Sequence, residues 1–139
     1  DGLISAIAIM EMLDRNPTKS MSDLRGELQK TWQTPTMSPH CDDETTYGIV
    51  DKVVKRFQDM KAAGNTVAGH AIDDLITVNG VRVVSDDGTW GLVRASSNKP
   101  ELVVVIESPV SEARMREMFK AVDDVLRENP EVGAYNQTI

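Results

Sequence analysis

Residues 79–106 read NGVRVVSDDGTWGLVRASSNKPELVVVI, and the arrangement of the surrounding chain follows from this segment. Asn79-Gly80 and Asp87-Gly88 are turn dipeptides, and the first predicts a tight hairpin whose two central residues both take positive φ. The apolar residues between the turns alternate or run together, as they do in strands. We therefore predict antiparallel strands over 81–84, 90–94 and 102–106, with a weaker strand over 70–77.

Helical periodicity flanks this predicted sheet on both sides. Before it, apolar residues from Ile49 to Met60 form one face opposite a charged face, and Gly64-Asn65 closes the helix. After it, Ser111 suits the N-cap of a helix whose apolar face extends to Leu126. Helices that cover one face of an antiparallel sheet make an α+β layer pair. We expect about four strands with the helices on one face, and a polar tail over the last ten residues.

The first part of the chain has a different character. Residues 3–13 are apolar almost all round, which is the pattern of a buried helix, and Ser20 to Asp23 fits a capping box that opens a short helix. Residues 30–42 carry Thr, Pro and Ser without periodicity, which indicates a linker. We expect two parts, a helical unit with its linker over 1–37 and a separate domain over 38–139.

Composition restricts the possible functions of the chain. Its 139 residues include 15 basic and 22 acidic side chains, a formal charge of −7, which leaves no basic surface for nucleic acid or an anionic membrane. No apolar run approaches the length of a bilayer span. A single cysteine, Cys41, fits a reducing compartment, so we expect a cytoplasmic protein. The start at Asp1-Gly2, without Met or a basic leader, indicates a cut inside a longer protein.

The segment between the last two predicted strands is rich in hydrogen-bond donors. It offers a guanidinium, two hydroxyls, an amide and an ammonium, and it contains no acid before Glu101. The guanidinium of arginine can donate two parallel hydrogen bonds to the oxygens of one phosphate. Consecutive backbone N–H groups in a turn can form a concave site that binds an anion. Composition alone favours an ordinary solvated loop, with an anion site as the alternative. The residues that supply these donors are Arg94, Ser96, Ser97, Asn98 and Lys99.

Other reactive side chains fit structural roles better than catalytic ones. The run from His40 to Glu44 lacks the spacing of a metal site and suits a helix N-terminus. His70 has no catalytic partner at a recognisable spacing, so we expect it at a strand edge. We interpret the pairs Asp73-Asp74 and Asp86-Asp87 as residues of solvated turns and strand edges. We therefore predict neither a metal site nor a catalytic residue in this chain.

Residues 86–102 resemble the C-terminal domain of the α-D-phosphohexomutases, and in particular the bacterial phosphomannomutase/phosphoglucomutase group. The family carries an Arg-x-Ser-x-x-x-Pro loop after a strand, matched here by Arg94, Ser96 and Pro100. Two more segments resemble the family in the right order, the hairpin over 79–83 and the N-terminal helix. Ser97, Asn98 and Lys99 depart from the usual loop residues, although serine and asparagine keep donor capacity and lysine adds positive charge.

The resemblance implies a TATA-binding-protein-like fold, as in the family's fourth domain, preceded by a helical remnant of the third. It implies a parent isomerase that interconverts hexose 1-phosphates and 6-phosphates through an active-site phosphoserine, with Mg²⁺. The loop residues Arg94, Ser96, Ser97, Asn98 and Lys99 would hold the non-reacting phosphate of the phosphosugar.

This sequence shows neither the phosphoserine loop nor the metal loop of that family. Without the missing N-terminal domains, we expect the chain to be inactive and to bind no Mg²⁺. The alternative is a stand-alone α+β module for small-ligand regulation or for protein interaction.

Overall fold

The computed structural model describes residues 1–139 and separates them into two units, Asp1–Lys30 and Thr31–Ile139. In the second unit the chain builds a six-stranded antiparallel sheet in the order β1-β6-β5-β4-β3-β2. The four longer strands are the ones that the sequence predicts. The strands are β1 Trp32–Gln33, β2 Thr66–Val67, β3 His70–Ile76, β4 Val81–Ser85, β5 Trp90–Ala95 and β6 Leu102–Ser108.

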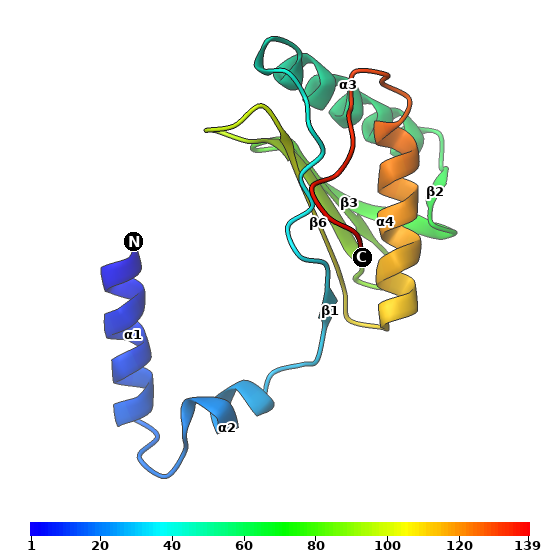
Figure 1. The fold of residues 1–139 in the computed structure, drawn as a ribbon. Coiled ribbons are helices and arrows are strands. Elements are labelled where there is room, and N and C mark those ends of the chain that lie inside the picture. Colours follow the sequence, from blue (N-terminus) through cyan, green and yellow to red (C-terminus); the bar gives the residue numbers. More distant parts are fainter. The chain divides into compact units, whose positions relative to one another are not determined.

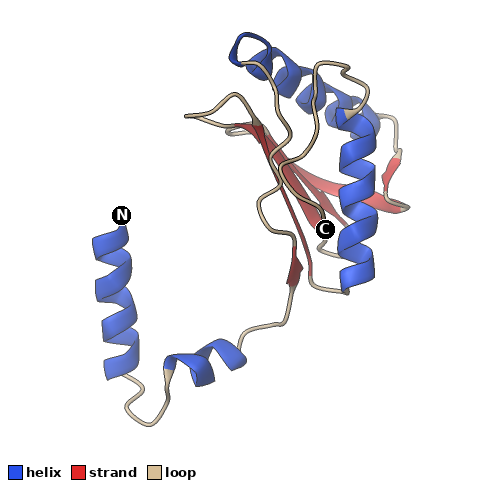
Figure 2. Cartoon of the chain, in the orientation of Figure 1, coloured by secondary structure: helices blue, strands red, loops and turns tan.

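One face of this sheet is apolar because every second residue of the central strands points toward it. Helices α3 (Asp43–Ala62) and α4 (Glu112–Leu126) both lie against that face, as Figure 2 shows. The predicted α+β layer pair, with helices on one face of an antiparallel sheet, is confirmed. The core between the layers includes Ile49, Val53, Phe57, Val83, Val93, Leu102, Val104, Ile106, Met118 and Val122.

The sheet has six strands, where the sequence predicts about four. The two additional strands, β1 and β2, contain two residues each and lie at the two edges of the sheet. A strand of two residues is too short to show an alternating pattern, so periodicity does not detect it.

Part of the segment that we interpreted as a linker belongs to the sheet. Trp32 of β1 pairs with Ser108 of β6, and Met37 is buried and forms a bridge with Val104. Backbone pairing along a sheet edge requires no particular side chains, which is why the composition of this segment resembles a linker.

The C-terminal residues are not the free polar tail that we expected. Tyr135 packs against the ring of Phe119, and Val132 is buried. The Oδ1 of Asn136 accepts a hydrogen bond from the N–H of Ser38 at 2.8 Å. The C-terminal residues therefore pack on the domain and are hydrogen-bonded to the segment that precedes α3.

The first unit contains α1 (Gly2–Asp14) and α2 (Met21–Gly26), and the predicted capping box is present between Ser20 and Asp23. The sequence pattern of the first helix is typical of a buried helix, but no residue of α1 is buried in this chain. Leu3 is 71% exposed and Ile4 is 66% exposed.

The turn between β3 and β4 depends on a glycine. Gly80 has a φ of 88°, but Asn79 does not take positive φ, so the expected pair of positive φ values is wrong. A Cβ atom at Gly80 would overlap the carbonyl oxygen of Val93 in β5. Glycine is thus required both by the backbone conformation and by the approach of the neighbouring strand.

We expect Gly80→Ala to lower the free energy of unfolding by about 3 kcal/mol, because alanine meets both a strained φ and a backbone clash. Urea denaturation followed by circular dichroism measures this change.

Gly48→Ala is the matched control, since Gly48 lies inside α3 and has no atom within 4 Å of the added methyl group. Alanine favours helix, so this variant should be as stable as the original chain or more stable by about 0.5–1 kcal/mol. Equal losses in both variants would contradict the role given to Gly80.

Candidate functional site

The loop after β5 is fixed at its base by the pairing of β5 with β6. Ala95 pairs with Leu102 in this ladder, and the N–H of Ser96 donates to the carbonyl of Glu101 at 3.0 Å. The loop forms the yellow-green tip between these strands in Figure 1. Its position is therefore set by a long, regular pair of strands.

The segment before α3 is tied to this loop. The N–H of Cys41 donates to the carbonyl of Pro100 at 3.0 Å, and His40 forms a bridge with Glu101. Helix α3 begins at Asp43, directly after these contacts. The first turn of α3 consequently lies beside the loop.

Most hydrogen-bond donors of the loop have no partner in the chain. The Ser96 hydroxyl donates to Oδ1 of Asn98 at 3.1 Å, which leaves the Nδ2 donors of Asn98 unpaired. The Ser97 hydroxyl, the Lys99 ammonium and the backbone N–H groups of residues 97–99 also donate to no atom of the chain. Three successive free N–H groups beside an ammonium form a local surplus of donors, which is the arrangement that suits an anion.

A pocket of about 300 Å³ lies between the loop and α3. Four of the five predicted residues line it, together with two residues from the first turns of α3 that the sequence analysis did not single out. The lining residues are Ser96, Ser97, Asn98, Lys99, Asp43 and Tyr47.

Arg94, the fifth predicted residue, does not line this pocket. It is half-buried near the end of β5, on the sheet face that the helices do not cover. Its Nη1 donates to the carbonyl of Ala95 at 2.9 Å, and its guanidinium makes no ion pair. The structure brings four predicted residues together and places this one outside their group.

Sequence reasoning missed Asp43 and Tyr47 because they lie about fifty residues before the loop. We assigned the run containing Asp43 to a helix N-terminus, and it is one. The remaining signal is Tyr47, an aromatic side chain on the charged, exposed side of a predicted helix.

The comparisons with known proteins bear directly on this domain. The family model described as "Phosphoglucomutase/phosphomannomutase, C-terminal domain" matches residues 42–125, which include α3, all but the last residue of α4, strands β2–β6 and the loop. The chain belongs to this family.

Relatives of this phosphohexomutase domain carry several mutase names. The phosphomannomutase/phosphoglucomutase of Pseudomonas putida is 31% identical over 134 residues, which are 95% of this chain and 26% of the relative. The probable phosphoglucosamine mutase of Methanopyrus kandleri is 31% identical over 127 residues, 91% of this chain and 25% of the relative. The chain spans about a quarter of the length of the curated relatives it matches.

A solved structure has the same fold as the chain. A phosphoglucomutase/phosphomannomutase family protein from Burkholderia thailandensis superposes with a TM-score of 0.68 over 99% of this chain and 26% of its own, at 23% identity.

Within the chain itself, none of the helices has the length and apolar character needed to cross a membrane.

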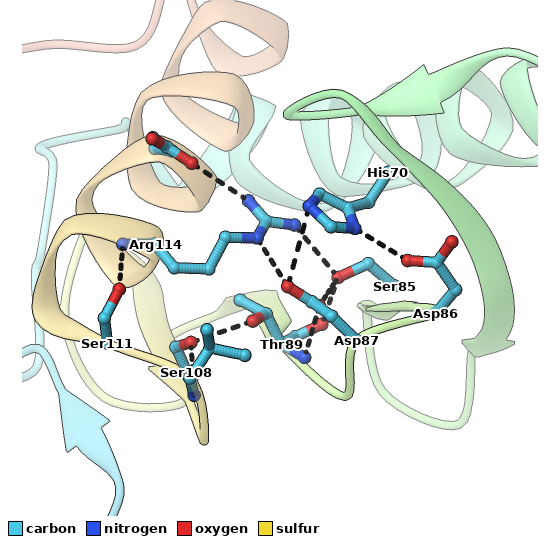
Figure 3. A network of polar contacts seen from close by, with 10 residues as sticks. His70, Ser85, Asp86, Asp87, Thr89, Ser108, Ser111 and Arg114 are labelled. Atoms are coloured by element: carbon cyan, nitrogen blue, oxygen red, sulfur yellow. Dashed lines mark hydrogen bonds and ion pairs between the residues drawn. The ribbon is translucent and has the colours of Figure 1, made fainter.

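The phosphohexomutase domain has a second polar cluster, at the opposite end of β5 from the loop (Figure 3). Nε of Arg114, on α4, donates to Oδ2 of Asp87 at 2.6 Å, and its Nη2 donates to Oγ of Ser85 at 3.2 Å. Nε2 of His70 lies 3.8 Å from the same Oδ2, and Nδ1 of His70 lies 2.7 Å from Asp86. This cluster joins α4 to the turn between β4 and β5.

The cluster contains the one grouping of side chains that resembles a metal site, His70 with Asp86 and Asp87. Mg²⁺ prefers an octahedral set of oxygen ligands. Here one oxygen of Asp87 accepts from Ser85 and the other from Arg114, a fixed positive charge that would repel a cation. The grouping therefore does not fit Mg²⁺, and its acids stabilise the fold.

The expectation that Asp86-Asp87 is a solvated pair is wrong for Asp87. Its side chain is only 15% exposed, and Arg114 is 5% exposed. Burial by itself would raise the pKa of Asp87, but hydrogen bonds from Arg114, the Thr89 N–H and Ser85 outweigh it and hold that pKa well below its usual range. The spacing of Arg114 four residues before buried Met118 is a signal that Arg114 faces inward, but it does not identify Asp87 as the partner.

We expect Asp87→Asn to lower the free energy of unfolding by about 3 kcal/mol at pH 7, because it leaves the buried charge of Arg114 with only the exposed carboxylate of Glu117, 3.8 Å away, as a counter-ion. A carboxylate with a lowered folded-state pKa contributes stability that is present above its unfolded pKa, about 3.9, and lost as the pH falls below it. The difference between the original chain and the variant should therefore shrink from about pH 4 downward. Urea denaturation at pH 7 and pH 3 measures it.

Asp86→Asn is the control for this experiment. The side chain of Asp86 is exposed and pairs only with His70, so its loss should cost less than about 1 kcal/mol at pH 7. A gap between the original chain and Asp87→Asn that stays constant down to pH 3 would show that the ion pair does not stabilise the fold in this way.

Proposed function

We propose that this chain is the substrate-binding C-terminal part of a phosphohexomutase that interconverts hexose 1-phosphates and 6-phosphates, and that its loop grips the phosphate that is not being transferred. The observation that carries the proposal is the group of unpaired donors at residues 97–99, which line a pocket with Ser96. In a chain of net charge −7, such a surplus of donors at one loop favours an anionic ligand.

The loop suits a grip that serves two substrate orientations. Backbone N–H groups, the Asn98 amide and the Lys99 ammonium all donate to phosphate oxygens, and none of them distinguishes one sugar from another. The relatives bear names that differ in the sugar, such as phosphoglucosamine mutase and phosphopentomutase, but share the phosphoryl group. A phosphate held here would position the distant end of the sugar for the reaction. Arg94 would join the grip by turning its guanidinium from Ala95 toward the ligand.

The remaining chemistry belongs, in this proposal, to the missing N-terminal domains of a cytoplasmic parent enzyme. They would supply the phosphoserine and the Mg²⁺ that neutralises charge during phosphoryl transfer. The chain itself offers a bound phosphosugar only orientation and partial cover from water.

We expect inorganic phosphate to shift the backbone amide signals of residues 94–99 in a nuclear magnetic resonance titration of the 139-residue chain. Lys99→Ala should weaken this binding about tenfold, because it removes a charge-assisted hydrogen bond. Arg94→Ala should also weaken it if the guanidinium turns toward the ligand.

Lys52→Ala is the matched control, because Lys52 is an exposed cation of α3 outside the pocket. Its loss changes the net charge by the same amount and should leave binding within about twofold. Shifts spread over the uncovered sheet face, with none at the loop, would favour a stand-alone binding module instead.

We also expect no mutase turnover from this chain alone. Its loop can hold a phosphate, but no described side chain is placed as a phosphoryl donor. A coupled assay with glucose 1-phosphate, on material free of host mutase, measures this. Steady turnover that survives further purification would overturn the expectation.

A further inference from the structure

The α3 side of the pocket carries chemistry that a bare phosphate does not use. Asp43 places a carboxylate among the lining residues, and Tyr47 places a phenol ring that is 65% exposed. A carboxylate repels phosphate, and an exposed aromatic ring contributes little to anion binding. The pocket therefore combines an anion-binding half with a half of different character.

The charge of Asp43 is not used inside the chain. Its carboxylate forms no hydrogen bond and no ion pair within the chain. Its oxygens are therefore available to accept hydrogen bonds from a ligand in the pocket. The positive end of the helix dipole also has Asp42 and Glu44 nearby, and these two acids do not line the pocket. Among the acids at this helix N-terminus, Asp43 is the one that lines the pocket together with the loop donors.

These groups fit the organic part of a phosphate ester. A carboxylate accepts strong hydrogen bonds from hydroxyl or ammonium groups, and a tyrosine ring offers an apolar surface with a polar tip. Small-ligand sites commonly pair an apolar wall with a few convergent polar groups that fix orientation. A phosphorylated sugar has an anionic end, several hydroxyls and apolar ring faces.

We propose that Asp43 and Tyr47 form the sugar-recognising half of the pocket, and this inference rests on the proposed function of the loop. Asp43 accepts a hydrogen bond from a hydroxyl of the phosphosugar, and the ring of Tyr47 packs against the sugar. Asp43 thus contributes to specificity, because its repulsion acts on the phosphate of both ligands, whereas its hydrogen bond to the sugar favours only the ester.

The test compares two probes, inorganic phosphate and glucose 6-phosphate, in nuclear magnetic resonance titrations of the 139-residue chain. For the original chain we expect glucose 6-phosphate to bind about fivefold tighter, the effect of one net hydrogen bond. In Asp43→Ala the ratio of the two dissociation constants should fall toward one, and only the part that comes from the packing of Tyr47 should remain. Asp43→Asn keeps an acceptor oxygen and should retain an intermediate ratio.

Asp51→Ala is the matched control, because Asp51 is an exposed acid of the same helix outside the pocket. It should keep the ratio of the original chain. The ratio is measured within each variant, so a general loss of stability does not imitate the expected effect. Tyr47→Ala should lower the ratio by removing the surface against which the sugar packs.

The outcomes separate this inference from the proposed function. If both probes shift residues 96–99 but the ratio in Asp43→Ala equals that of the original chain, the inference is wrong and the phosphate grip stands. A ratio of one in the original chain also overturns the inference. If neither probe shifts the loop, the proposed function fails, and the inference fails with it.

Discussion

The pairing of β5 with β6 is the constraint on which the candidate site depends. Its register runs from Trp90 opposite Glu107 to Ala95 opposite Leu102, and one face of both strands is buried beneath the helices. A slip of one residue would turn Val93 out of the core, so burial fixes the register. The register in turn fixes where the strands separate and the loop begins. Hydrophobic packing thereby sets the position of a polar site that lies outside the core.

The sequence predicts those parts of the fold that local patterns encode. The four longer strands, the capping serines at positions 20 and 111 and the apolar face of α3 follow from periodicity and turn chemistry. The edge strands β1 and β2 do not, because two residues contain no period. The burial of Asp87 was also hidden, since its partner Arg114 comes from a helix 27 residues later. Long-range pairing is invisible to a reading of neighbouring residues.

The candidate site also combines residues that the sequence predicts with residues that it does not. Residues 96–99 are contiguous, and their donors can be recognised from the chain alone, whereas Asp43 and Tyr47 join them only through backbone bonds such as Cys41 to Pro100. The placement of Arg94 is a further example, because strand alternation assigns it to a sheet face and the loop residues to a tip. A resemblance to a family predicts which residues belong to a motif, but it does not predict the side-chain conformations of those residues.

The two ends of β5 differ in how far their charges are exposed to water. Arg114 and Asp87 meet where solvent hardly reaches, whereas Lys99 is exposed at the tip of the loop. Dissolved ions screen exposed charges over about 10 Å at 0.1 M and affect buried pairs much less. In the proposed function, ionic strength should therefore change the affinity of the loop for an anion more than it changes the strength of the buried ion pair between Arg114 and Asp87.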